Sequence, residues 1–83
     1  MTQIAKLYAY ARANPRGLSF REFERLLAAF GFVLDRTVGS HRHYVHTRVP
    51  DVLTVLPVGK AVKPYLVRLF LAMVDEYGLG FDR

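Results

Sequence analysis

The chain has 83 residues, of which 52% are hydrophobic and none is cysteine, so it can bury one small core but excludes a disulfide framework and a thiolate metal site. Its longest apolar run, residues 69–74, is far too short to cross a bilayer, and its start lacks the apolar region of a signal peptide, so we expect a cytoplasmic protein without membrane contact. The formal charge of +5 resides in the middle of the chain, where residues 36–68 carry six basic side chains and one acidic one. This distribution indicates a polyanionic partner or a surface kept cationic for solubility.

Two helices are predicted in the first third of the chain. The first has Thr2 as its candidate N-cap and ends at residues 14–17, where a proline and a glycine interrupt the helical pattern. The second begins at the capping-box pair Ser19 and Glu22 and ends at Gly31. The apolar stripes of the two helices are Ile4, Leu7, Tyr8 and Ala11 in the first, and Phe20, Phe23, Leu26, Leu27 and Phe30 in the second.

An antiparallel meander of three strands is predicted next, because short segments rich in β-branched and aromatic residues alternate with turn residues. The first turn is expected at Gly39 and Ser40. The second is expected at residues 49–51, since Pro50 cannot occupy a central strand. The strands themselves are expected at residues 32–38, 41–47 and 52–56.

A last helix is predicted from Pro64 to about Tyr77, with Gly78 ending it. Its core stripe is expected to be Leu66, Leu69, Phe70, Met73 and Tyr77. A second apolar line, formed by Val67, Leu71 and Val74, needs a cover of its own. We expect the first helix to provide it, and a partner chain in a dimer is the alternative. The element order predicts an α+β domain of two layers, with a three-stranded sheet packed on helices.

The window from Gly39 to His46 is the strongest candidate for a functional site, because it holds all three histidines of the chain. If residues 41–47 form a regular strand, alternate side chains point to opposite faces of the sheet. His41 and His43 then share one face, Arg42, Tyr44 and His46 share the other, and only one face meets the helices.

Those residue types suit RNA cleavage, in which the 2′-hydroxyl is the nucleophile and groups are needed for two proton transfers and for holding the phosphate. His41 is the candidate general base or acid, since histidine titrates near neutral pH. His43 is either an auxiliary proton-transfer group or part of the scaffold, and His46 is expected to fix the strand end. Tyr44 either stacks on a base or fills the core. The candidate phosphate- and RNA-binding residues are Arg36, Ser40, Arg42, Lys60 and Lys63.

The chain also resembles a known family in the spacing of a few residues. Gly31-Phe32, Arg36, Gly39-Ser40-His41 and Tyr44 are followed by a strand ending at Pro57, then Gly59-Lys60 and Lys63-Pro64. This arrangement resembles the HicA family of mRNA interferase toxins over about residues 20–79.

The resemblance implies a fold similar to a double-stranded-RNA-binding domain, with residues 19–79 as the family core and residues 1–18 as an N-terminal helical extension. It also implies RNA cleavage by His41 without a metal or other cofactor, and neutralisation by a HicB-like antitoxin, with the toxin a monomer or a dimer. One position departs from the pattern, because many family members have a second histidine just after the proline that ends the third strand, and this chain has Val58 there.

Three other functions compete with RNA cleavage as interpretations of this window. A zinc or copper site could recruit the His-x-His pair, although His46 has the wrong parity to complete it. Serine catalysis through Ser40 lacks the glycine that a nucleophile elbow needs on its other side. An RNA-binding module of the same fold without turnover is the remaining alternative, and the missing second histidine is the observation in its favour.

Overall fold

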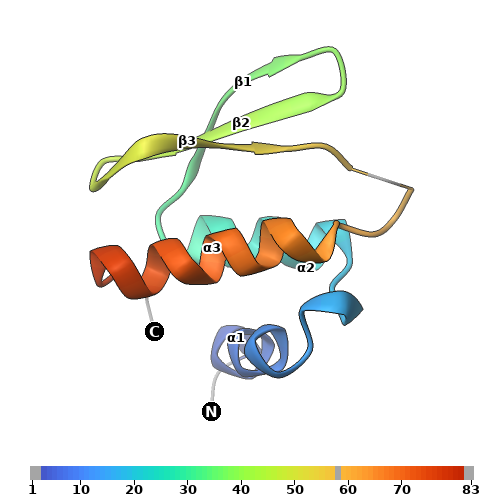
Figure 1. Ribbon diagram of the computed structural model, residues 1–83, viewed down its shortest axis with the longest axis vertical. Coiled ribbons are helices and arrows are strands. Elements are labelled where there is room, and N and C mark those ends of the chain that lie inside the picture. Colours follow the sequence, from blue (N-terminus) through green and yellow to red (C-terminus); the bar gives the residue numbers. More distant parts are fainter. Residues whose placement is uncertain (1–2, 58, 82–83) are drawn as a thin grey trace.

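The computed structural model describes residues 3–57 and 59–81, so the candidate N-cap Thr2 lies outside it. Three helices, one short 3-10 turn and a three-stranded sheet follow the predicted order, which confirms the α+β fold. Figure 1 shows the sheet on one side of helices α2 and α3, and α1 on the far side of those helices. The elements are α1 (Gln3–Ala13), η1 (Pro15–Gly17), α2 (Phe20–Ala29), β1 (Val33–Val38), β2 (His41–His46), β3 (Val49–Val55) and α3 (Pro64–Tyr77).

The ends of α2 and α3 are set by local sequence, as predicted. The Glu22 backbone N–H donates to Ser19 Oγ at 3.1 Å, and the Ser19 N–H donates to Glu22 Oε1 at 3.0 Å, which completes the capping box. Helix α3 begins at Pro64 and is terminated by Gly78, whose φ of +62° lies in the left-handed region. No described helix has the length and apolar content that crossing a membrane requires.

The sheet has the strand order β1-β2-β3 with antiparallel pairing, so β1 and β3 are both edge strands. One face packs on α2 and α3, where Tyr44, Leu53 and Val55 are buried against residues such as Phe23 and Phe70. The rings of these two phenylalanines meet edge to face at a centroid distance of 5.7 Å. The core therefore lies between the sheet and the helix pair, and no element of the described residues lies over the opposite face of the sheet (Figure 1).

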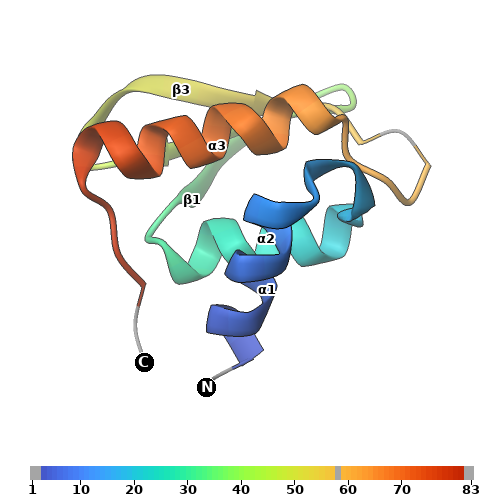
Figure 2. The ribbon, with the colours of Figure 1, turned by 60° about the horizontal axis from the view of Figure 1, so that its bottom comes forward.

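The second apolar line of α3 is covered by the chain itself. Val67, Leu71 and Val74 are all buried, α1 lies against α2, and η1 lies against α3 (Figure 2). Arg12 of α1 also forms an ion pair with Asp75 of α3. The N-terminal segment of the same chain therefore covers this side of α3, and η1 provides part of the cover that was expected from the first helix alone.

Packing on two sides also explains where the predicted core stripe of α3 was wrong. Leu69 was expected in the core, yet 41% of it is exposed. Because α3 is covered both by the sheet and by the N-terminal segment, its buried arc is centred between the two apolar lines. Leu69 lies beyond the edge of that arc, and Tyr77 is only half-buried.

The second predicted turn was placed too late in the chain. The chain turns at Thr47 and Arg48, His46 pairs with Val49, and β3 begins at Val49 instead of residue 52. Val49 is buried, and the burial of its apolar side chain favours its inclusion in the strand. Pro50 lies within β3 because an edge strand has one side without a partner, where a missing N–H leaves no hydrogen bond unmade.

Candidate active site

His41 is the first residue of β2 and follows a tight turn. Gly39 adopts a φ of +60°, which favours glycine, and the turn brings Val38 opposite His41 in the register. Both Ser40 and His41 are exposed. Among the described residues, His41 is the one histidine whose side chain makes no hydrogen bond, so its ring is available to a ligand.

The predicted alternation along β2 is present. Arg42, Tyr44 and His46 face the helices, where all three make contacts with α2 or with its C-terminal end. His43 faces the other way, with its Nδ1 atom 3.0 Å from Thr54 Oγ1 on β3. His41 and His43 therefore share the uncovered face of the sheet.

His46 is part of the scaffold, as expected. Its Nε2–H donates to the Phe30 carbonyl at 2.9 Å, and its Nδ1 accepts the Arg48 backbone N–H at 3.0 Å. These two bonds join the end of β2 to the end of α2 and to the following turn. Both ring nitrogens are thereby occupied on the face opposite to His41 and His43.

The three histidines do not converge on one point, because His46 is engaged on the opposite face from the other two. Within residues 3–57 and 59–81, no group of three or more histidine, cysteine, aspartate or glutamate side chains could hold a metal ion. The His-x-His pair therefore lacks a third protein ligand among the described residues.

Glu24 is a site residue that sequence reasoning missed. Its Oε2 atom accepts a hydrogen bond from Arg42 Nη1 at 3.0 Å and one from Tyr44 Oη at 3.1 Å. Burial of the Tyr44 phenol, and then its hydrogen bond to the Glu24 carboxylate, raise the pKa of Tyr44 above its ordinary value. The one signal in the sequence is that Glu24 lies four residues after Phe20, on the helical face turned toward the core.

Tyr44 and Arg42 are consequently held in place. Tyr44 is only 5% exposed, so its ring belongs to the core and not to a surface on which a base could stack. The Arg42 guanidinium lies 5.0 Å from the centre of the Phe20 ring while it pairs with Glu24. A pocket of about 250 Å³ adjoins it, lined by Thr37, Gly39, Ser40, Arg42 and Pro57.

The remaining predicted cations fall into two groups. Arg36 pairs with His43 in the register after an irregularity between Leu34 and Arg36, and it forms an exposed ion pair with Asp35 at 3.5 Å. This places Arg36 beside the two outward-facing histidines. Lys60 and Lys63 are exposed in the loop between β3 and α3 and not on β2. Lys60 lies close to the start of α2, and Lys63 precedes α3.

Comparison with protein families identifies the family to which the chain belongs. The family described as the HicA toxin of bacterial toxin-antitoxin matches residues 20–73, which span α2, the whole sheet and most of α3. Searches of curated proteins and of solved structures gave no match. The matched region is most of the chain and contains the Gly39–His41 turn, so this protein belongs to the HicA family of toxins of bacterial toxin–antitoxin systems.

Proposed function

We propose that this toxin is an endoribonuclease, an mRNA interferase that cleaves RNA without a metal, and that His41 carries out a proton transfer. The observation that carries the proposal is the position of His41. It stands exposed at a tight turn, with an unbonded imidazole, on the sheet face that no other described element covers. An RNA strand can reach that imidazole without any rearrangement of the fold.

The chemistry needs no external nucleophile. One imidazole accepts the proton of the ribose 2′-hydroxyl, whose oxygen attacks the adjacent phosphorus and forms a 2′,3′-cyclic phosphate. The bond from phosphorus to the 5′-oxygen breaks, and an acid gives that oxygen a proton to form a 5′-hydroxyl. His41 takes one of these two roles.

His43 is the proposed second proton-transfer group. It lies on the same face as His41, and its contact with Thr54 through Nδ1 orients the ring while leaving Nε2 for proton exchange. Arg36, opposite His43 in the register, supplies positive charge where negative charge grows on the phosphate. Ser40 at the turn, Arg42 on the helix side of the sheet, and Lys60 and Lys63 in the loop before α3 are proposed to bind RNA away from the cleaved bond.

Cleavage of a labelled messenger RNA, with EDTA in every reaction, tests this proposal. His41→Ala is expected to lower the cleavage rate by about 10²- to 10⁴-fold, the usual contribution of a general acid or base, while RNA binding persists. Arg16→Ala, an exposed cation on η1 far from β2 in sequence, serves as the control and is expected to cleave like the wild type. Wild-type protein that needs a divalent metal, or His41→Ala protein that cleaves normally, contradicts the proposal.

A second candidate is an RNA-binding module of this fold without turnover. It is favoured by the absence of a histidine just after Pro57, where many relatives have one. This alternative predicts that neither wild-type nor His41→Ala protein cleaves, while both bind RNA with the same affinity. The cleavage experiment above therefore separates the two functions.

An antitoxin is the expected protein partner, because the family consists of toxins of toxin–antitoxin pairs. We propose that it is of the HicB type and that it covers the His41 face of the sheet, which would keep RNA away from the imidazole. Copurification from cells that express both genes, with and without His41→Glu, tests this partner: a charge buried at the interface is expected to weaken the complex.

A further inference from the structure

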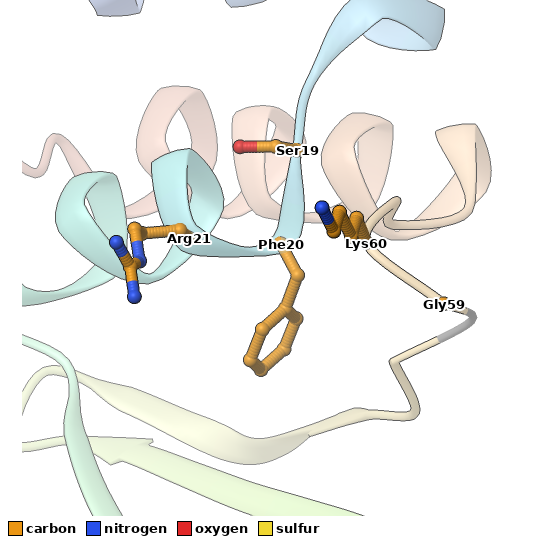
Figure 3. Close-up of a pocket in the computed structure, with 5 residues that line it drawn as sticks. All are labelled: Ser19, Phe20, Arg21, Gly59 and Lys60. Carbon is orange, nitrogen blue, oxygen red and sulfur yellow. The ribbon is translucent and has the colours of Figure 1, made fainter.

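A pocket of about 470 Å³ lies where α2 begins against the loop that connects β3 to α3 (Figure 3). Main-chain contacts hold the two segments together. The Phe20 N–H donates to the Lys60 carbonyl at 2.8 Å, and Ser19 forms an isolated β-bridge with Ala61. Because backbone atoms make these contacts, the two walls keep their spacing when the side chains change rotamer. The lining residues are Ser19, Phe20, Arg21, Gly59 and Lys60.

Two cations at this pocket have no acidic partner among the described residues. Arg21 and Lys60 are exposed, and neither forms an ion pair with any carboxylate in the described part of the chain. The nearest acids along α2 are already engaged, since Glu22 caps the helix and Glu24 binds Arg42 and Tyr44. The pocket therefore has a positive rim that an anion can neutralise.

The ring of Phe20 supplies an aromatic surface between these cations. In Figure 3 its side chain extends from the start of α2 toward the sheet, with Arg21 on one side and Lys60 on the other. Phe20 is only partly buried, and the Arg42 guanidinium lies near its ring. Positive charge around an aromatic ring that stays partly accessible is the combination with which proteins bind single-stranded nucleic acid.

The pocket lies on the helix side of the sheet, and Arg42 links it to the turn that precedes His41. Arg42, which contacts Phe20, lines the smaller pocket beneath the Gly39–Ser40 turn, and Pro57 of that pocket begins the loop that carries Lys60. The backbone N–H groups of Ser19 and Glu22 at the start of α2 are not available to bind an anion, because the capping box already uses them. Side-chain charge and the aromatic ring are what the pocket offers a ligand.

We infer that this pocket binds one unpaired nucleotide of the RNA substrate, with its base against Phe20 and a phosphate held by Arg21 and Lys60. The inference rests on the proposed function and adds that the substrate is single-stranded where it passes α2. A paired duplex keeps its base faces stacked, so it cannot place a base on the Phe20 ring.

Fluorescence anisotropy with a labelled 2′-fluoro oligonucleotide tests the pocket without cleavage, because such a strand lacks the 2′-hydroxyl nucleophile. Phe20→Leu keeps an apolar side chain but removes the ring. It is expected to weaken binding of the single strand by about tenfold and to leave binding of the same sequence as a duplex unchanged. Equal affinity of Phe20→Leu and wild type for the single strand overturns the inference.

A second pair of variants separates local from general charge effects and does not alter the core. Arg21→Gln with Lys60→Gln is compared with Arg16→Gln and Arg68→Gln, two exposed cations outside the pocket that have no described ion pair. The pocket pair is expected to lose about tenfold more affinity than the control pair, which lowers the net charge equally. Equal losses in the two pairs overturn the inference, and thermal melting verifies that each variant is folded.

Failure of this inference is distinguishable from failure of the proposed function. If single-strand binding depends on Phe20 but wild-type protein does not cleave RNA, the pocket is correct and the ribonuclease proposal is wrong. If His41→Ala abolishes cleavage while Phe20→Leu binds the strand like wild type, the ribonuclease proposal is supported and the pocket inference is wrong.

Discussion

Glu24 on α2 and Arg42 on β2 are joined by a hydrogen-bonded ion pair of 3.0 Å, and this pair connects the helical layer to the strand that begins at His41. The same carboxylate accepts the hydroxyl of Tyr44, two residues further along β2. One side chain of α2 therefore fixes two consecutive inward-facing residues of β2. By the alternation of a strand, it also fixes the outward direction of His41 and His43.

Glu24→Gln is expected to lower the free energy of unfolding by about 1 kcal/mol, because both hydrogen bonds lose their charged acceptor. The loss is limited because solvent reaches both partners of the ion pair. Urea denaturation measures it. Glu76→Gln, an exposed acid of α3 with no described ion pair, is the control and is expected to change stability by less than about 0.5 kcal/mol. Equal effects of the two substitutions would contradict the role given to Glu24.

The raised pKa of Tyr44 predicts a loss of stability in alkaline solution. The folded protein retains the phenol proton at a pH where the unfolded chain has begun to lose it, so the unfolded state binds fewer protons there. Stability is therefore complete below the ordinary pKa of tyrosine, about 10, and falls as the pH rises through the higher folded-state value. Tyr44→Phe is expected to make the decline above about pH 10 shallower than in wild type. Parallel urea titrations at several alkaline pH values measure the difference, and identical slopes would refute the prediction.

Two neighbours on α1 are expected to differ greatly in their effect on stability. Ala11 is completely buried, so Ala11→Asp places an unpaired charge between α1 and the helical layer and is expected to cost about 3 kcal/mol or to detach α1. Arg12→Ala removes the exposed ion pair with Asp75 and is expected to cost less than about 1 kcal/mol. Thermal melting compares them. A mild effect of Ala11→Asp would mean that α1 contributes little to the fold.

Gly31 and Gly39 both adopt a positive φ, so alanine substitutions at the two positions can be compared. Gly39→Ala is expected to cost about 1 kcal/mol for the backbone conformation alone, since no atom lies within 4 Å of the added Cβ. Gly31→Ala carries the same kind of penalty at φ +93°, and its Cβ would also stand 2.9 Å from His46 Nε2. It is expected to cost about 2 kcal/mol or more, because the bond from His46 to Phe30 must also shift. Chemical denaturation that ranks Gly39→Ala as the more harmful substitution would contradict this reading of His46.

Local chemistry in the sequence was enough to predict the elements and the direction of the histidines. The Ser19–Glu22 cap and the Pro64 and Gly78 boundaries act over a few residues, so they can be predicted without knowledge of the fold. The same is true of β2, where a period of two determines that His41 and His43 share a face. The family resemblance, carried by the Gly39–His41 turn, is likewise a property of sequence and is confirmed by the family match.

Tertiary structure alone decided which side chains are buried and which contacts form between residues of different elements. Leu69 is exposed because α3 is covered from two sides, and Val49 enters β3 because an edge strand tolerates Pro50. The link between Glu24 and Arg42 spans 18 positions, and the pocket joins Phe20 to Lys60 across more than twice that separation. Such contacts depend on how layers pack, and no short-range pattern in the sequence encodes that packing.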